Sequence, residues 1–174
     1  MRLGLLLVVV GSLLLAGCVD EPVGDTDDAP EPTLDSDAVF GLRIFAVELH
    51  GAIAPGEEKT WRVEVRNGGA PGENSVDYRD GCGNPWQAEV QDADGRPAAW
   101  QEPMAQCMGF QEKELRGGEK HAFAWTWDAR RWDEGAKRMQ DAPEGRYTLL
   151  LTFEGEHDGT HPTDVTARTT FEVR

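Results

Sequence analysis

Cysteine is the residue type with the widest chemistry in this 174-residue chain, and it occurs three times, as Cys18, Cys82 and Cys107. A cysteine thiol can form a disulfide, bind a metal, act as a nucleophile or carry a lipid. Cys18 directly follows an apolar run near the N-terminus, whereas Cys82 and Cys107 lie far inside the chain. These positions predict different chemistry for the first cysteine and for the other two.

The N-terminal residues have the three-part pattern of a secretory signal peptide. Arg2 supplies a positive charge, residues 3–16 are almost entirely apolar, and the small residues Ala16 and Gly17 come before Cys18. The apolar run is shorter than the roughly 20 residues that a permanent membrane-spanning helix needs. We therefore expect residues 1–17 to be a signal peptide that is removed on export.

The four residues Leu15-Ala16-Gly17-Cys18 resemble the bacterial lipobox, in which the cysteine receives a diacylglyceryl group and a peptidase cleaves before it. This resemblance implies a lipidated Cys18 that anchors the mature protein to a membrane on its extracytoplasmic side, because two or more acyl chains give stable anchoring. An ordinary secretory signal with an incidental cysteine is the alternative. The choice between an inner and an outer membrane stays open.

Residues 18–38 are predicted to be a disordered acidic linker. The segment has prolines, few large apolar side chains and no basic residue, so it cannot bury enough surface to fold. A flexible chain of about 20 residues would hold the domain roughly 25 Å from the membrane. Its eight acidic residues are Asp20, Glu21, Asp25, Asp27, Asp28, Glu31, Asp35 and Asp37.

The formal net charge of the chain is −15. Such an acidic protein repels phosphate, which argues against nucleic acid and anionic headgroups as partners beyond the lipid anchor itself. Residues 39–174 are long enough for one domain with a real core.

An exported domain with two remaining cysteines most often pairs them, so we expect a Cys82–Cys107 disulfide. It would close a loop of about 26 residues and contribute about 3 kcal/mol in the chain-entropy model. A metal site helped by Met104, Met108 or His121 is the alternative. The chain has no Cys-x-x-Cys and no closely spaced histidines, so we expect no metal and no cofactor.

No pattern of catalytic residues stands out. The mature chain has only Ser36 and Ser75 as serines, and neither lies in a nucleophile elbow. His121 alternates with apolar residues and is expected at the edge of the core. His157 and His161, with Glu154, Glu156 and Asp158, are expected in a solvated polar hairpin, with a loop-bound cation as the alternative. The chain is therefore not expected to be an enzyme.

Alternation of apolar and polar residues dominates from residue 39 onward and predicts half-buried strands. Strands are expected at 40–49, 61–66, 86–91, 108–115, 121–127, 147–153 and 165–173. Glycine-containing turns separate them, which favours a two-sheet antiparallel β-sandwich of about seven or eight strands, with an up-and-down barrel as the alternative. Residues 128–143 break the alternation and are expected to be a loop, with a short helical turn at 133–139 as the alternative.

Six tryptophans divide into two groups. Four of them alternate as core residues do, namely Trp61, Trp86, Trp125 and Trp127. Trp100 and Trp132 lie near expected loops or strand ends, where an exposed aromatic side chain can anchor a partner. Both are candidate partner-binding residues.

Residues 59–149 resemble the BsuPI-type family of intracellular proteinase inhibitors, which has an immunoglobulin-like β-sandwich. The matching segments are Trp61 to Asn67, Val90 to Gly95 with Trp100, Leu115 to Glu119, Phe123 to Asp128 and Gly145 to Thr148. The chain departs from the family in Arg116-Gly117, where the family has proline and glycine, and in its two cysteines.

We expect a non-enzymatic, membrane-anchored lipoprotein whose sandwich binds a protein or another partner in the cell envelope. The alternative, which the resemblance implies, is a proteinase inhibitor that inserts residues 128–143 or 69–85 into a protease cleft. An enzyme that uses carboxylates or a loop-bound cation is a third reading. A fold alone does not decide among these.

Overall fold

The computed structural model of the protein describes residues 32–81, 84–99, 109–133 and 135–174. These residues form strands and connecting turns, and none of the described ranges contains a helix long and apolar enough to cross a membrane. The expected all-β fold is confirmed.

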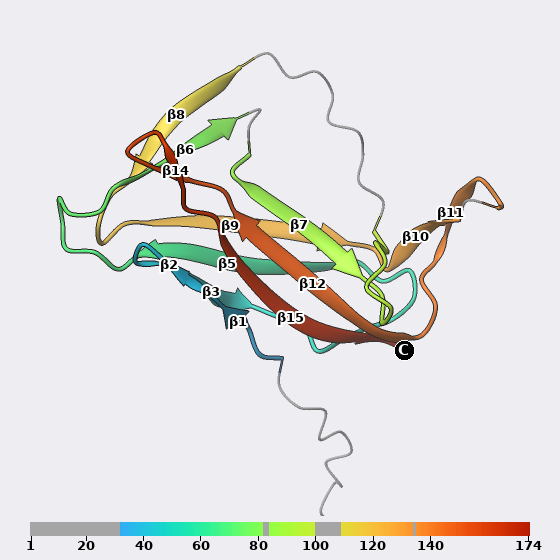
Figure 1. The fold of residues 1–174 in the computed structure, drawn as a ribbon. Helices are drawn as coiled ribbons and strands as arrows, with labels where there is room; N and C mark the ends of the chain where they lie inside the picture. Colours follow the sequence, from blue (N-terminus) through green and yellow to red (C-terminus); the bar gives the residue numbers. More distant parts are fainter. Residues whose placement is uncertain (1–31, 82–83, 100–108, 134) are drawn as a thin grey trace, which may run out of the picture.

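Two sheets pack face to face as a sandwich (Figure 1). The first has the order β2-β3-β5-β9, and the second has the order β1-β15-β12-β7, with β4 added parallel to β15. The order β3-β5-β9 against β7-β12-β15 is that of strands A, B, E against C, F, G in immunoglobulin-like domains. The first sheet comprises β2 (Ala38–Val39), β3 (Leu42–Glu48), β5 (Lys59–Asn67) and β9 (Lys120–Trp127); the second comprises β1 (Asp35–Ser36), β4 (Ala52–Ile53), β7 (Trp86–Gln91), β12 (Gly145–Phe153) and β15 (Val165–Val173).

Two smaller sheets extend from opposite ends of the sandwich (Figure 1). One has the order β14-β13-β6-β8 and is formed by β6 (Val76–Gly81), β8 (Phe110–Leu115), β13 (Glu156–His157) and β14 (His161–Pro162). The other is a hairpin of β10 (Arg130–Asp133) and β11 (Arg138–Asp141). We call the first the side sheet and the second the basic hairpin.

The core lies between the two large sheets, because alternate residues of each strand face inward. In β12 and β15 the alternation is nearly unbroken over nine residues each. Trp61, Trp86 and Trp127 are buried and Trp125 packs against the core, as the sequence predicts. The largest fully buried side chains include Trp61, Phe153, Phe171, Leu42, Ile44, Ile53, Leu149 and Leu151.

Tyr147 near the start of β12 forms the tyrosine corner that is typical of immunoglobulin-like sandwiches. Its hydroxyl donates a hydrogen bond of 2.8 Å to the carbonyl oxygen of Pro143, four residues upstream. This bond fixes the chain where it enters the strand.

Residues 128–143 differ from the expectation, since they contain the two strands of the basic hairpin instead of a loop or a helical turn. The sequence hides this hairpin because it has almost no apolar stripe. Trp132 and Met139 are direct cross-strand partners, and their neighbours on both strands are charged or polar.

The ordered region also begins before residue 39. β1 and the first residue of β2, Ala38, fall in the segment for which the sequence predicts disorder. Asp35 and Ser36 add to the edge of β15, and the Arg168 guanidinium binds the Asp35 carboxylate at 2.9 Å. Backbone pairing therefore orders a segment that has little apolar surface of its own.

Candidate functional site

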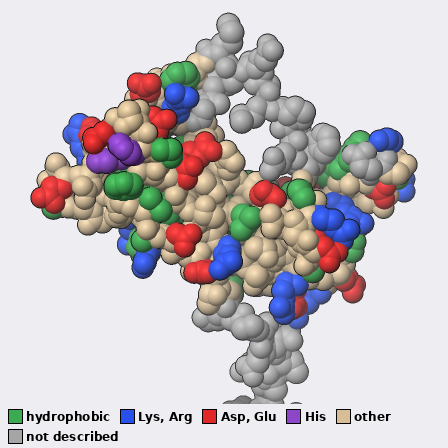
Figure 2. All heavy atoms as spheres, viewed as in Figure 1, with side chains coloured by type: hydrophobic (Ala, Val, Ile, Leu, Met, Phe, Trp, Pro, Cys, Tyr) green, Lys and Arg blue, Asp and Glu red, His purple; other side chains and the backbone are tan. Residues whose placement is uncertain are grey.

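A hollow of about 1130 Å³ lies between the side sheet and the adjoining ends of β7 and β12. Figure 2 shows this part of the surface at the upper left, where Asp, Glu and His side chains gather. The residues that line it come from five strands and the turns beside them, and they include Asp77, Glu112, Gln87, Glu154 and Glu156. A concave surface of this kind is the default place to look for a binding site.

A rigid aromatic cluster supports the hollow from beneath. The Trp86 ring stacks on Phe123 with centroids 5.1 Å apart and meets Phe153 edge-on at 5.2 Å. Tyr78 of the side sheet reaches the same cluster, 5.1 Å from His121 and 5.5 Å from Phe153. These contacts hold the side sheet against the sandwich, so the walls of the hollow are fixed by core packing.

His121 joins this cluster through a hydrogen bond, because the Trp86 indole Nε1–H donates to His121 Nδ1 at 2.9 Å. The bond requires Nδ1 to be unprotonated, which places the proton of a neutral ring on Nε2. Burial lowers the pKa of His121 below that of a free histidine, with a smaller raising effect from Asp80 and a lowering effect from Lys113. His121 lies at the core edge, as the sequence predicts.

The rim of the hollow has acidic side chains that are direct cross-strand partners of one another. Glu156 lies directly opposite Asp77, and Asp77 lies directly opposite Glu114, so three carboxylates follow one another across three strands. Like charges in such positions repel. Arg116 forms an ion pair with Glu114 at 3.0 Å, but within the described ranges no ion pair neutralises Asp77, Glu112 or Glu156.

Glu154 and Asp164 add two more carboxylates to the lining. The Gln87 amide donates to Glu154, and no ion pair in the described part of the chain reaches either carboxylate. The lining has two basic side chains, Arg79 and Lys113, against six carboxylates. Lys113 binds Asp80, and the Arg79 guanidinium lies 4.9 Å from the centroid of the Phe110 ring. The hollow therefore carries excess negative charge.

His157 and His161 do not form a metal site with their acidic neighbours. They are cross-strand partners in β13 and β14, and His157 Nδ1 lies 3.0 Å from the carbonyl oxygen of Ser75. Across the described residues, no group of three or more His, Cys, Asp or Glu side chains is placed to hold a metal ion. The polar hairpin that the sequence predicts is present.

Phe40 is a feature that sequence reasoning missed. It and Gly41 form the two-residue turn between β2 and β3, with φ of 48° and 82°, as in a type I′ turn. Phe40 is half exposed, and its ring stacks on His157 with centroids 5.2 Å apart. A bulky residue rarely adopts positive φ, so the stack offsets backbone strain.

Of the candidate residues from the sequence, Trp132 is described and Cys18, Cys82, Cys107 and Trp100 lie outside the described residues. Trp132 is partly buried on β10, opposite Met139. Gly81 and Phe110, which are close in sequence to the two inner cysteines, are cross-strand partners. The Cys82–Cys107 disulfide, the lipid on Cys18 and the partner-binding role of Trp100 stay predictions.

Residues 69–85, which the sequence offers as one loop for a protease cleft, contain β6, which pairs with β8 along its whole length. Residues 128–143 project from the sandwich as the basic hairpin (Figure 1). The structure therefore separates the two segments: the first is built into a sheet, and the second is exposed.

No protein-family model matches the chain, and a search of curated proteins finds no similar one. The resemblance to the BsuPI-type inhibitors therefore stays a prediction.

Among solved structures, the chain is similar to β-glucosidases. The enzyme from Listeria innocua in complex with glucose shares 12% identity at a TM-score of 0.46, over 76% of this chain and 16% of that one. The enzyme from Erythrobacter marinus shares 16% identity at a TM-score of 0.39, over 82% and 16%. The chain thus spans less than a fifth of the length of these enzymes, and similarity at this level indicates neither a family nor an activity.

Proposed function

We propose that this protein is an extracytoplasmic lipoprotein, anchored through lipid on Cys18, whose β-sandwich binds a cationic partner in the acidic hollow and catalyses no reaction. The observation that carries the binding role is the set of uncompensated carboxylates around a hollow with rigid walls. Fixed charges without partners attract a complementary ligand and exclude ligands of the same sign.

The geometry supports binding better than catalysis. The carboxylates Asp77, Glu112 and Glu156 are exposed side chains on strands, and a water-filled surface gives a carboxylate little catalytic power. The Nδ1 atom of His121 already accepts the Trp86 hydrogen bond, and Nδ1 of His157 lies 3.0 Å from the Ser75 carbonyl oxygen. The lipobox-like residues Leu15-Ala16-Gly17-Cys18 support the lipid anchor. A domain tethered in this way would meet its partner at a membrane surface.

Binding can be tested with the full-length lipoprotein in detergent micelles and a fluorescent nona-arginine peptide as probe. We expect salt-sensitive binding and a roughly tenfold loss of affinity in Glu112→Gln/Glu156→Gln, which removes two rim charges. The matched control is Asp37→Asn/Glu58→Gln, which removes two exposed charges elsewhere and should bind as the wild type does. Equal losses in both variants would show that only net charge matters and would overturn the site.

The anchor has its own test. Cells that express the wild type and Cys18→Ser are labelled with radioactive fatty acid. Label on the wild type alone supports lipidation, whereas equal label on both proteins would contradict it.

A proteinase inhibitor is the second candidate, and the exposed position of the basic hairpin favours it. An inhibitor presents a projecting segment that a protease cleft can receive. Full activity of a panel of serine proteases in the presence of micromolar protein would remove this candidate, and it would leave the acidic hollow unaffected.

A further inference from the structure

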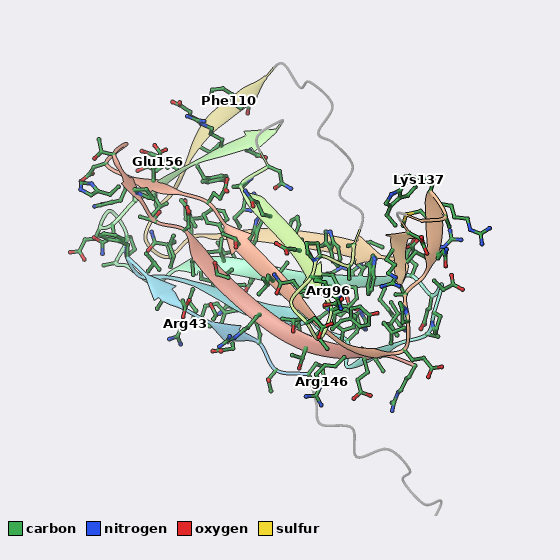
Figure 3. All side chains as sticks on the ribbon, turned by 45° about the vertical axis from the view of Figure 1, so that its right-hand side comes forward. Arg43, Arg96, Phe110, Lys137, Arg146 and Glu156 are labelled. Carbon is green, nitrogen blue, oxygen red and sulfur yellow. The ribbon has the colours of Figure 1, made fainter. Side chains whose placement is uncertain are left out.

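The first sheet ends in β9, an edge strand that no other described strand covers. β9 pairs with β5 on one side, and among the described strands none pairs with its other side. Figure 1 shows β9 along the upper margin of this sheet, whereas β1 and β2 lie at the other side of the sandwich (Figures 1 and 3). The unpaired N–H and C=O groups of such an edge are a template for a further strand.

The register shows which backbone groups β9 offers at this edge. The Asn67 N–H donates to the Glu119 carbonyl oxygen at 3.0 Å, so the pairing of β5 with β9 begins with a hydrogen-bonded pair. Hydrogen-bonded and non-hydrogen-bonded pairs alternate along antiparallel strands. The backbone groups of Ala122, Ala124 and Thr126 therefore point away from β5, and no hydrogen bond from another described residue reaches them.

Other edges of the molecule carry protection that β9 lacks. β8 has three charged side chains in six residues, β14 is two residues long and contains Pro162, and the Val90 carbonyl oxygen of β7 accepts from the Ala98 N–H at 2.7 Å. In β9, Lys120 is the only Lys, Arg, Asp or Glu, and the strand has no proline and no bulge. Charges, prolines, bulges and covering segments are the means by which proteins prevent pairing at an edge. β9 is therefore suited to receive a strand.

Opposite charges lie at the two ends of β9. At its start, Lys120 and Arg66 share the buried carboxylate of Glu64, so these three side chains leave one positive charge. Just after its end, Asp128 forms no ion pair with any described residue. An antiparallel strand of the same sequence places Lys120 near Asp128, whereas a parallel one places like charges together. The edge is thus complementary to a second copy of itself.

One antiparallel register satisfies both the backbone and the side chains. It sets Ala124 opposite Ala124 of the second copy, on a two-fold axis. Ala122 then lies opposite Thr126 of the second copy, and each such pair exchanges two hydrogen bonds between outward backbone groups. Lys120 lies opposite Asp128 of the second copy. The side chains of Ala122, Ala124 and Thr126 are exposed and small, so they leave room for the approach.

The same register also pairs aromatic rings. On the inner face of the sheet it sets Phe123 opposite Trp125 of the second copy. Both rings are only half-buried in one copy, because β9 is at the edge of the sandwich. Aromatic pairs of this kind stabilise adjacent strands.

We propose that β9 is an association surface, on which β9 of a second copy of this chain adds antiparallel and joins the two first sheets into one. The contact is isologous, since the same residues of both copies form it. Main-chain hydrogen bonds supply the affinity and the register supplies the specificity, as in other cases of strand addition. None of the described residues that line the hollow belongs to β9, so this inference is independent of the proposed function.

The test places charges on the two-fold axis. Two full-length copies with different affinity tags are expressed together, solubilised in mild detergent and captured through one tag. Wild-type copies should capture each other. Ala124→Lys should capture itself roughly fivefold less, and so should Ala124→Glu, because each sets like charges directly opposite one another. A mixture of Ala124→Lys with Ala124→Glu should recover wild-type capture, since opposite charges then meet.

The matched controls are Val47→Lys and Val47→Glu, which add the same charges at an exposed position of β3, and they should capture as the wild type does. Recovery in the mixture also shows that both Ala124 variants fold. If Ala124→Lys failed to fold, Ala124→Glu decides alone, because its new carboxylate lies opposite Arg62 within the same copy. Absence of capture between wild-type copies, unchanged self-capture of Ala124→Glu, or no recovery in a mixture of folded variants would overturn the proposal.

Discussion

At the scale of single residues, His121 connects the charge state of the protein to its packing. Its ring contacts Tyr78 and Phe153 and accepts the Trp86 hydrogen bond, so a proton on Nδ1 would remove that bond. Because burial lowers its pKa, the folded state binds fewer protons than the unfolded state at mildly acidic pH. The free energy of unfolding should therefore fall as pH falls below about 6.5, the value of a free histidine.

Chemical denaturation at pH 7.5 and pH 5.5 measures this dependence. Part of the loss of stability at pH 5.5 should disappear in His121→Gln, whereas the exposed His161→Gln should keep the wild-type dependence. An NMR titration gives the pKa of His121 directly. A value above that of a free histidine would contradict the role assigned to burial.

Asn67 is the buried polar residue on which the turns near the side sheet depend. Its side-chain amide donates to the carbonyl oxygens of Leu115 and Asn74, and its Oδ1 accepts from the Gly69 N–H at 3.1 Å. Asn67→Ala leaves these backbone groups without a partner, and it should cost about 2–3 kcal/mol of unfolding free energy. Urea denaturation checks this, with the exposed Gln111→Ala as a control that should change stability by less than about 0.5 kcal/mol. A cost as small as that of the control would show that water replaces the amide.

At the scale of elements, the turn between β8 and β9 allows almost no volume at Gly117. A Cβ atom there would lie 2.1 Å from the carbonyl oxygen of Ala70 and 2.8 Å from that of Glu73. Since both are backbone atoms, the turn that contains Gly117 and the loop that contains Ala70 and Glu73 would have to move apart. Gly117→Ala should lower the unfolding free energy by about 2 kcal/mol or more. Gly109→Ala is the control, because a Cβ there meets nothing within 4 Å, and an equal loss in both variants would contradict the steric reason.

The turn between β2 and β3 stores strain that a substitution can release. Asparagine before glycine suits a type I′ turn, whereas phenylalanine at φ of 48° does not. Phe40→Asn removes a strain of about 1–2 kcal/mol but also loses the stack on His157, which is worth about 0.5–1.5 kcal/mol. The stabilisation should therefore be larger in a His157→Ala background than in the wild type. Thermal denaturation of the four proteins of this cycle checks it, and equal effects in both backgrounds would show that the stack contributes nothing.

The elements that the sequence predicts well are strands with one buried face and one solvent-exposed face. Trp61, Val63 and Val65 alternate with charged residues, and all three are buried in β5. The basic hairpin escapes prediction because both of its faces are mostly polar. The candidate site could not be predicted from the sequence for a related reason. Asp77, Glu114 and Glu156 come from three strands, and only the cross-strand register brings them together. Neither feature has a periodic signal along the chain.

At the scale of the whole molecule, added salt is expected to act in opposite directions on stability and on the binding of a cationic partner. The excess of acidic residues makes the compact state repel itself, and this repulsion acts over longer distances than the ion pairs do. Added salt screens long distances first, since the Debye length falls from about 10 Å at 0.1 M to about 3 Å at 1 M. The exposed ion pairs that salt also weakens contribute about 0–1 kcal/mol each. Salt should therefore stabilise the folded monomer.

We expect the Tm of the dilute full-length protein to rise by several degrees between 50 mM and 500 mM NaCl, which corresponds to about 1 kcal/mol. Over the same range, the affinity for the nona-arginine peptide should fall, because salt screens the carboxylates of the hollow. The opposite signs separate a change in binding from a change in folding, because a protein that merely unfolded at high salt would lose Tm and peptide binding together. A fall in Tm with salt would mean that the local ion pairs outweigh the net repulsion, and it would contradict this prediction.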